Sequence, residues 1–308
     1  MHPFSIPMKV RFRGIERRDG LLLHGPSGWG EFSPFPGYDA AESRAWARAA
    51  HEAAYGAWPP PRRTSIPVNA TVPAVDGPAA YNLVKRSGCT SVKVKVAEGD
   101  DHERVAAVRD ALGPAGKLRI DVNGLWDIDT AARRIKELDR YDLEYVEQPT
   151  RTLQEMAALR RRVDVPLAAD ESIRKADDPL RVAGLEAADI VVLKVQPLGG
   201  VNAALQIAEA CGLPAVVSSA LETSVGIAAG LALAAALPEL PYACGLATVA
   251  LLDGDVVTDP LVPRNGAIEF RRPEVDADAL AAFATEDDTM IARYRAAAAL
   301  GGSIGAPL

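Results

Sequence analysis

The stretch Thr90–Asp100, TSVKVKVAEGD, alternates valines with two lysines. The valines favour a β-strand, because β-branched side chains suit a pleated surface. Residues two apart in a strand point to the same side, so Lys93 and Lys95 share one face and the valines share the other. This pattern predicts a strand whose valine face is buried and whose opposite face holds two ammonium groups side by side.

Seven further strand-like stretches recur along the chain, each followed by a helix-like segment rich in Ala, Leu and Arg. They are SIPVNATV (65–72), KLRIDVNG (117–124), LEYVEQP (143–149), VPLAADES (165–172), DIVVLKVQPL (189–198), PAVVSSALE (214–222) and YACGLATV (242–249). A spacing of roughly 25 residues is typical of a repeated β-α unit with parallel strands. Eight such strands predict an α/β fold, a modified TIM-type (β/α) barrel, rather than an open doubly wound sheet.

The two ends of the chain depart from this rhythm. Short strand candidates and a helix-like run come first, and PPPRR at 59–63 then breaks the pattern. Beyond the eighth predicted strand, strand-like and helical patterns return. We expect residues 1–64 and 260–308 to form a small discontinuous α+β capping domain, and residues 65–259 to form the barrel.

Composition excludes several classes of protein. A net charge of −7 leaves no basic excess for nucleic acid, and no apolar run reaches the roughly 20 residues that span a bilayer. The N-terminus lacks the apolar core of a signal peptide. Cys89, Cys211 and Cys244 form no CxxC pair, which fits a reducing compartment. We expect a cytoplasmic globular protein, and no pattern in the sequence sets its oligomeric state.

Polar side chains end five successive predicted strands, the place where barrel enzymes carry their chemistry. In chain order they are Lys93 and Lys95, Asp121 and Asn123, Glu147, Asp170 and Glu171, and Lys194. Each alone has a plainer interpretation, as a lysine at a sheet edge, an aspartate in a turn or a glutamate paired with a helix arginine. The set as a whole favours function, because unpaired buried charges cost several kcal/mol each.

The second and sixth strands of a closed barrel face each other, and the third to fifth strands lie on the arc between them. Three converging carboxylates, on Asp121, Glu147 and Asp170, with no Cys or His beside them, predict a site for a divalent cation, most naturally Mg²⁺. The lysines would flank this cation. The lysine face of the Thr90–Asp100 strand is therefore predicted to line the barrel mouth.

Taken in order, KVKV, DVNG, VEQP, ADES and LKVQPLGG resemble the motifs of the enolase superfamily, in its muconate-lactonizing subgroup. The resemblance spans about residues 65–250. It implies that the three carboxylates bind Mg²⁺ and that Lys95 and Lys194 are the acid/base lysines. It also implies a capping-domain loop that closes the site. Here that loop is in EFSPFPGYD (31–39), around Phe32 to Asp39, although a plain surface turn is an alternative interpretation.

The implied chemistry is removal of an α-proton from a carboxylate substrate through an enediolate that the cation stabilises. The base must be neutral, and Lys93, the cation and partial burial all lower the pKa of Lys95. Asn123 is expected to hold a ligand or a lysine without adding charge. Glu171 would oppose the lowering of a lysine pKa if it pointed at that lysine, and the sequence leaves its direction open.

Within the subgroup, the sequence most resembles the o-succinylbenzoate synthases of the actinobacterial type. Dipeptide epimerases usually carry an acidic DxD at the eighth strand, where this chain reads CGLATVALL. The resemblance implies a carbon-oxygen lyase (hydro-lyase) that removes water from 2-succinyl-6-hydroxy-2,4-cyclohexadiene-1-carboxylate in menaquinone biosynthesis. An N-acylamino-acid (N-succinylamino acid) racemase, or both activities in one site, is the open alternative.

The segment SSALETSVG after the seventh predicted strand resembles the region where these synthases hold the succinyl carboxylate. We expect Ser218 and Ser219, with backbone amides and the helix start near Thr223, to bind an anion there. An ordinary turn with a serine cap is the alternative interpretation. Gly245, in the eighth predicted strand, is a further candidate for substrate contact.

Overall fold

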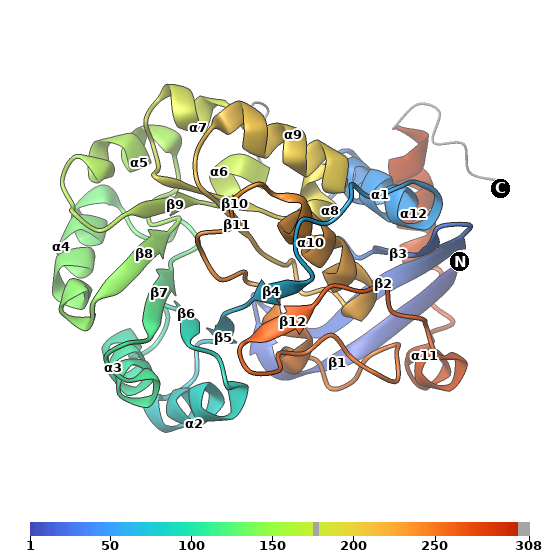
Figure 1. The fold of residues 1–308 in the computed structure, drawn as a ribbon, viewed down its shortest axis with the longest axis horizontal. Helices are drawn as coiled ribbons and strands as arrows, with labels where there is room; N and C mark the ends of the chain where they lie inside the picture. The colour runs from blue at the N-terminus through green and yellow to red at the C-terminus, as the bar shows by residue number, and fades with distance from the viewer. Residues whose placement is uncertain (175–178, 301–308) are drawn as a thin grey trace.

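A computed structural model describes residues 1–174 and 179–300 of the chain (Figure 1). Seven parallel strands form one curved sheet in the order β11-β10-β9-β8-β7-β6-β5. Their bounds are β5 Ala70–Val72, β6 Ser91–Lys95, β7 Lys117–Asp121, β8 Leu143–Glu147, β9 Leu167–Ala169, β10 Ile190–Leu193 and β11 Ala215–Val217. Each β-strand lies within a stretch that the sequence predicts, and the barrel fold is confirmed.

The prediction of an eighth strand at 242–249 is wrong, because this stretch forms no β-strand. Cys244 and Gly245 instead form single parallel bridges, to Val68 on one side and to Ser218 on the other. These two bridges close the barrel between β11 and β5. A Cβ on Gly245 would meet Ser218 Oγ at 2.5 Å, so the close approach at this seam requires glycine.

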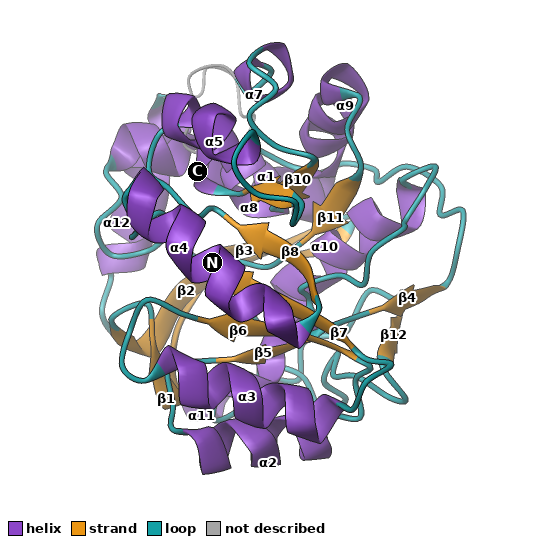
Figure 2. Cartoon of the chain, turned by 90° about the vertical axis from the view of Figure 1, so that its left-hand side faces the viewer, coloured by secondary structure: helices purple, strands orange, loops and turns teal. Residues whose placement is uncertain are grey.

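Helices cover the outer face of the curved sheet, as Figure 2 shows for α4 in front of β7 and β8. The helices of this part are α2 Gly77–Ser87, α3 Asp101–Leu112, α4 Ile128–Leu138, α5 Leu153–Arg160, α6 Glu171–Arg174, α7 Arg181–Gly184, α8 Val195–Leu198, α9 Val201–Cys211 and α10 Ser224–Ala236. Two 3₁₀ turns, η1 Asp139–Tyr141 and η2 Ala247–Leu251, complete it. Aspartates cap α2, α3 and α4, and each side chain accepts a backbone N–H of the first turn.

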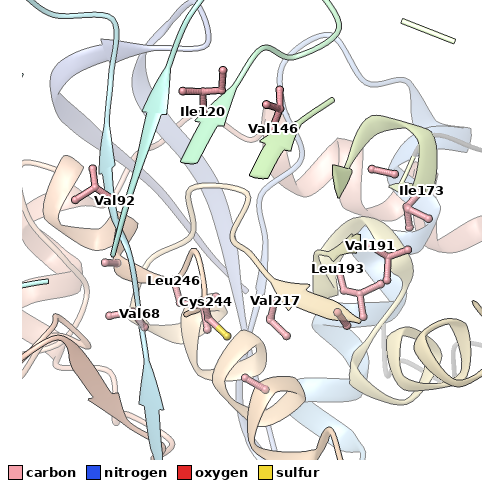
Figure 3. Close-up of a cluster of buried hydrophobic side chains, with 14 of the residues drawn as sticks. Val68, Val92, Ile120, Val146, Ile173, Val191, Leu193, Val217, Cys244 and Leu246 are labelled. Atoms are coloured by element: carbon pink, nitrogen blue, oxygen red, sulfur yellow. The ribbon is translucent and has the colours of Figure 1, made fainter. Parts of the chain in front are cut away.

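The alternation predicted for β6 decides what is inside the barrel. Val92 is one of the buried apolar side chains packed between sheet and helices, the cluster drawn in Figure 3. The opposite face of the strands points into the barrel, where Tyr145, Ala168, Val192 and Val216 belong to a separate apolar cluster. Each of these four lies two residues before a polar side chain at the barrel mouth, so the polar layer rests on an apolar floor.

The first and last parts of the chain lie together (Figure 1). Strands β1 His2–Phe12, β2 Ile15–Gly25 and β3 Gly28–Phe32 form an antiparallel sheet, followed by α1 Ala40–Tyr55. The C-terminal helices α11 Ala277–Phe283 and α12 Thr289–Ala299 pack on β1 and α1 respectively. Strand β12 Ala267–Glu269 pairs with β4 Ser65–Pro67. The domain boundaries at 64 and 260 stay a prediction, and residues 301–308 lie outside the described chain.

The glycine pair that follows α8 joins the capping helix to the barrel. Glu52 of α1 accepts the backbone N–H of Val201 at 2.5 Å and that of Asn202 at 3.1 Å, and so caps α9. Gly200 has φ +126°, and a Cβ there would meet Glu52 Oε2 at 2.6 Å. Glycine therefore permits both the backbone turn and the contact of the two parts.

In the described residues, no helix is both long enough and apolar enough to cross a membrane. All three cysteines lie in the described chain, and none of them forms a disulfide.

Candidate active site

Five charged side chains meet at the mouth of the barrel. Parallel pairing places Lys95 beside Asp121 and Asp121 beside Glu147, while Asp170 directly follows β9 and Lys194 directly follows β10. Four of the five are buried, and the Lys95 side chain is 13% exposed. The arrangement predicted for these residues, with cations on the flanks and carboxylates between them, is the one that the structure contains.

Lys93 lies deepest and holds two of the carboxylates. Its Nζ lies 2.7 and 2.9 Å from the two carboxylate oxygens of Glu147 and 3.6 Å from Asp121 Oδ2. Burial lowers the pKa of Lys93, but the charges of Glu147 and Asp121 outweigh burial and raise it. Burial and the charge of Asp121 raise the pKa of Glu147 to about 7. Lys93 is therefore a fixed cation of the site.

Lys95 is the most exposed cation of the row. Its Nζ lies 2.5 Å from Asp121 Oδ2 and 2.5 Å from Asn123 Oδ1, with the Phe12 ring centroid 5.4 Å away. Burial lowers the pKa of Lys95, Asp121 opposes this, and the charges of Arg13 and Lys93 lower it further. The direction predicted for this lysine is confirmed, although Arg13 was not among the predicted causes.

Lys194 faces the pocket from the opposite side. Its Nζ lies 2.7 Å from Asp170 Oδ2, and Arg174 Nε lies 3.0 Å from the other oxygen, Asp170 Oδ1. Burial lowers the pKa of Lys194, and Asp170 opposes the shift. Burial raises the pKa of Asp170, but the Arg174 and Lys194 charges hold it well below its usual range. Asp170 is thus the counter-charge of two buried cations.

Within residues 1–174 and 179–300, Glu171 contacts two arginines and Asn123 and no lysine. One oxygen, Oε1, accepts hydrogen bonds from Arg13 at 2.7 Å, Arg174 at 2.5 Å and Asn123 at 3.2 Å. Asn123 in turn accepts from Lys95, so its amide connects the lysine to Glu171. Asn123 thus holds a lysine without adding charge, as predicted.

The charged row faces a small pocket. It is lined by Phe12, Arg13, Phe35, Thr71, Lys93, Lys95, Asp121, Lys194, Ser218, Ser219, Ala220, Leu221, Gly245 and Thr248. Phe35 comes from the loop predicted as a lid. Phe12 and Arg13, at the turn between β1 and β2, were missed from the sequence, where a two-residue hairpin tip carries no signal of a distant pocket.

The chemistry of the donors fits a hard divalent cation. The charges of Asp121 and Asp170 raise the pKa of Glu147, so the three carboxylates lie near enough to repel one another. Each turns an oxygen to a lysine instead, and in residues 1–174 and 179–300 no three His, Cys or acidic side chains form a closed ligand set. A cation here would compete with the three lysines for the same oxygens.

The helix start near Thr223 does not offer free amides to an anion, contrary to the prediction. The N–H groups of Thr223 and Gly226 donate to the carboxylate of Glu31 at 3.1 and 3.0 Å. The N–H of Ser224 donates to Asp255 at 3.2 Å. Two carboxylates of the protein thus already occupy the N-terminus of α10. The side chains of Ser218 and Ser219 still line the pocket.

Burial and the charge of the neighbouring Glu222 raise the pKa of Glu31 from 4.5 to about 7. Hydrogen bonds from the hydroxyls of Ser33 and Thr223 and the charge of Arg18 lower this pKa, but by less. The folded protein thus binds a proton that the unfolded chain releases between pH 4.5 and 7. The stability that Glu31 contributes therefore falls as the pH rises through this window. We expect the free energy of unfolding, measured relative to Glu31→Gln, to fall by up to about 3 kcal/mol across it.

Denaturant titrations of the two proteins at pH 4.5 and pH 7 measure this difference. Glu16→Gln, at an exposed glutamate of the neighbouring strand β2, is the matched control. If Glu31→Gln and Glu16→Gln gave the same dependence on pH, the buried carboxyl would not be the titrating group.

Two family models match the chain. The model described as enolase C-terminal domain-like matches residues 78–274, and the model described as enolase N-terminal domain-like matches residues 4–54. The chain is 60% identical over 301 residues to the o-succinylbenzoate synthase of Thermobifida fusca (strain YX). This match covers 96% of this chain and 95% of the relative. It is 50% identical over 295 residues to the o-succinylbenzoate synthase of Mycobacterium marinum, covering 94% and 89%.

Solved structures share the fold at low identity. The muconate lactonizing enzyme of Pseudomonas fluorescens, complexed with muconolactone, has a TM-score of 0.78 at 21% identity and covers 92% of this chain and 97% of its own. The N-succinyl Arg/Lys racemase of Bacillus cereus has a TM-score of 0.77 at 20% identity and covers 92% and 96%. The chain therefore belongs to the enolase superfamily and, within it, to the family of the o-succinylbenzoate synthases.

Proposed function

We propose that this chain catalyses the o-succinylbenzoate synthase reaction, the removal of water from 2-succinyl-6-hydroxy-2,4-cyclohexadiene-1-carboxylate for menaquinone biosynthesis. The observation that carries the proposal is identity to curated synthases over almost the whole chain. Two lysines facing one pocket supply the chemistry that such an elimination needs. We place the reaction in the cytoplasm, in keeping with three cysteines outside any disulfide.

Lys95 is the proposed base. Its neutral amine takes the proton from the carbon next to the substrate carboxylate. The electron pair left behind forms the new ring double bond as the C–O bond to the hydroxyl group breaks. The ammonium group of Lys95 then donates its proton to the departing hydroxide, so one water leaves. The lowered pKa of Lys95 and the hydrogen bond to Asn123 support this assignment.

Lys194 is proposed to stay cationic on the opposite side of the substrate. Its ammonium group lines the pocket and stabilises the negative charge that develops as the proton leaves. Lys93, held by Glu147, contributes a second fixed positive charge below the pocket.

Members of this superfamily need a divalent metal ion, and we propose Mg²⁺, held by Asp121, Glu147 and Asp170. When bound, the ion supplies positive charge beside the substrate carboxylate and so makes the α-proton more acidic.

Among the described residues, the charges of the site balance on this scheme. The four fixed cations described are Lys93, Lys194, Arg13 and Arg174, and the four carboxylates described are Asp121, Glu147, Asp170 and Glu171. Lys95 is neutral as the base. The two positive charges of the metal ion then offset the two carboxylates of the substrate, which avoids an uncompensated buried charge. We propose that Ser219 and Gly245, on the pocket wall, contact the succinyl part of the substrate.

N-acylamino-acid racemisation in the same site is a second candidate. It requires a proton-exchanging lysine on each face of the substrate, and Lys95 and Lys194 both line the pocket. The discriminating experiment is deuterium uptake into N-succinyl amino acids of each hand in D₂O, which only the racemase shows.

The test of the proposal is a spectrophotometric assay of the cyclohexadiene substrate with metal-stripped protein. We expect turnover only after Mg²⁺ is restored, because the three carboxylates otherwise hold lysines. Equal turnover with chelator and with Mg²⁺, or no turnover with either, would contradict the proposal.

A further inference from the structure

We propose that Arg18 and Glu31 of the capping domain are positioning residues of the active site, which fix the loop 218–223 that forms one wall of the pocket. The inference rests on the proposed function, because the loop contacts the substrate only if this pocket binds it. Neither residue lines the pocket itself. Their effect is therefore exerted through the main chain of the loop.

Arg18, on β2, holds the loop by its carbonyl groups. The side chain is fully enclosed, with 1% of the residue exposed. Nε donates to Leu221 O at 2.8 Å and Nη2 donates to Ala220 O at 3.0 Å. Nη2 also donates to Ser33 O, at the start of the predicted lid. One guanidinium group thus connects the pocket wall to the lid loop that carries Phe35.

The loop adopts a backbone conformation that needs such support. Leu221 has φ +66°, a left-handed conformation that costs a branched residue roughly 1–2 kcal/mol. Its carbonyl oxygen is the one that Arg18 Nε contacts. The following residue, Glu222, accepts the N–H of Ala220 at 2.6 Å. The conformation of the loop is therefore held by Arg18 from outside the loop together with a hydrogen bond within it.

Glu31, on β3, holds the other end of the loop. Its carboxylate accepts the N–H of Thr223 at 3.1 Å, the hydroxyl of Thr223 at 2.5 Å and the N–H of Gly226 at 3.0 Å. A Cβ at residue 226 would lie 3.0 Å from Glu31 Oε2, so glycine gives the carboxylate room there. The first turn of α10 is thus pinned to the capping domain.

Arg18 and Glu31 of the capping domain therefore bracket a segment of six residues, 218–223, and the first four of these residues line the pocket. Ala220 and Leu221, whose carbonyl groups Arg18 contacts, both line the pocket. Loss of the Arg18 side chain leaves two carbonyl groups of the loop, those of Ala220 and Leu221, without this donor. A misplaced pocket wall costs catalysis far more than the same displacement elsewhere, since reacting groups must meet within a few tenths of an ångström.

The matched control for Arg18 is Arg63. Arg63 donates to Ala234 O at 2.7 Å, Leu237 O at 2.7 Å and Pro238 O at 2.9 Å, at the opposite end of the same helix α10. Its three printed contacts are all at residues 234–238, outside the loop 218–223, and it does not line the pocket. Arg18→Met and Arg63→Met thus remove comparable clamps from the two ends of one helix.

We expect Arg18→Met to raise KM for the cyclohexadiene substrate by about 10- to 100-fold, with kcat reduced less, and Arg18→Lys to recover part of the loss. Arg63→Met is expected to leave KM within about threefold of the wild type. Amide hydrogen exchange is the second readout, and it does not need turnover. Residues 218–223 should exchange at least about tenfold faster in Arg18→Met and in Arg18→Lys than in Arg63→Met.

The proposal would be overturned if Arg18→Met and Arg63→Met had equal KM values, equal hydrogen exchange in residues 218–223 and equally lowered Tm. Arg18 would then be a stabilising residue only. If the wild type does not turn over the substrate, the proposed function fails by itself. Hydrogen exchange then decides the positioning role alone, and unchanged protection of 218–223 in both Arg18 variants would overturn it.

Discussion

Lys95→Ala is expected to lower kcat for dehydration by about 10²–10⁴-fold, the range typical of a lost general acid–base group. Lys95 both receives the α-proton and returns it to the departing hydroxide, so no second group substitutes for it on that face. The fold should survive, because Asp121 keeps Lys93 at 3.6 Å as a counter-charge. Steady-state assays and a thermal melt of the same preparation measure the two effects together.

Lys85→Ala removes a lysine in the last turn of α2, away from the pocket, and is the control for loss of positive charge. We expect its kcat to match the wild type. Substantial dehydration by Lys95→Ala, with kcat within a few-fold of Lys85→Ala, would remove Lys95 from its proposed role.

Asp170→Asn is expected to lower the free energy of unfolding by about 3–5 kcal/mol in metal-free protein. The carboxylate is fully buried and pairs with Lys194 at 2.7 Å and Arg174 at 3.0 Å. An amide removes the charge that Lys194 and Arg174 share, and of the two only Arg174 keeps another described carboxylate, Glu171 at 2.5 Å. Denaturant unfolding with chelator present measures the loss.

Asp129→Asn provides the comparison. Asp129 pairs with Arg162 at 2.8 Å, but its side chain is 81% exposed and that of Arg162 is 44% exposed. Solvent screens such a pair, so we expect a loss of at most about 1 kcal/mol. Equal losses for Asp129→Asn and Asp170→Asn would show that Asp170 is not the counter-charge of a buried cluster.

Local patterns in the sequence were sufficient to predict the strands that carry the site. Alternation in the Lys93–Lys95 strand predicted which side chains enter the barrel, since that rule depends only on neighbours along the chain. Chain order then predicted that Asp121, Glu147 and Asp170 lie between the lysines, because consecutive parallel strands pair in order.

Features made by distant parts of the chain were beyond the same rules. Glu31 meets Thr223 across 192 positions, so the sequence near Thr223 suggested free amides where the fold places a carboxylate. Phe12 enters the pocket only because the capping sheet docks on the barrel. Likewise, the stretch predicted as the eighth strand closes the barrel only by single bridges at Cys244 and Gly245.

The central claim is that Asp121, Glu147 and Asp170 release their lysines to hold one divalent ion between Lys95 and Lys194. Diffraction from crystals grown with Mn²⁺ in place of Mg²⁺, recorded at the manganese absorption edge, tests it most directly. We expect one anomalous peak within about 2.5 Å of an oxygen from each carboxylate. A peak elsewhere, or carboxylates still paired with the lysines at saturating Mn²⁺, would contradict the claim.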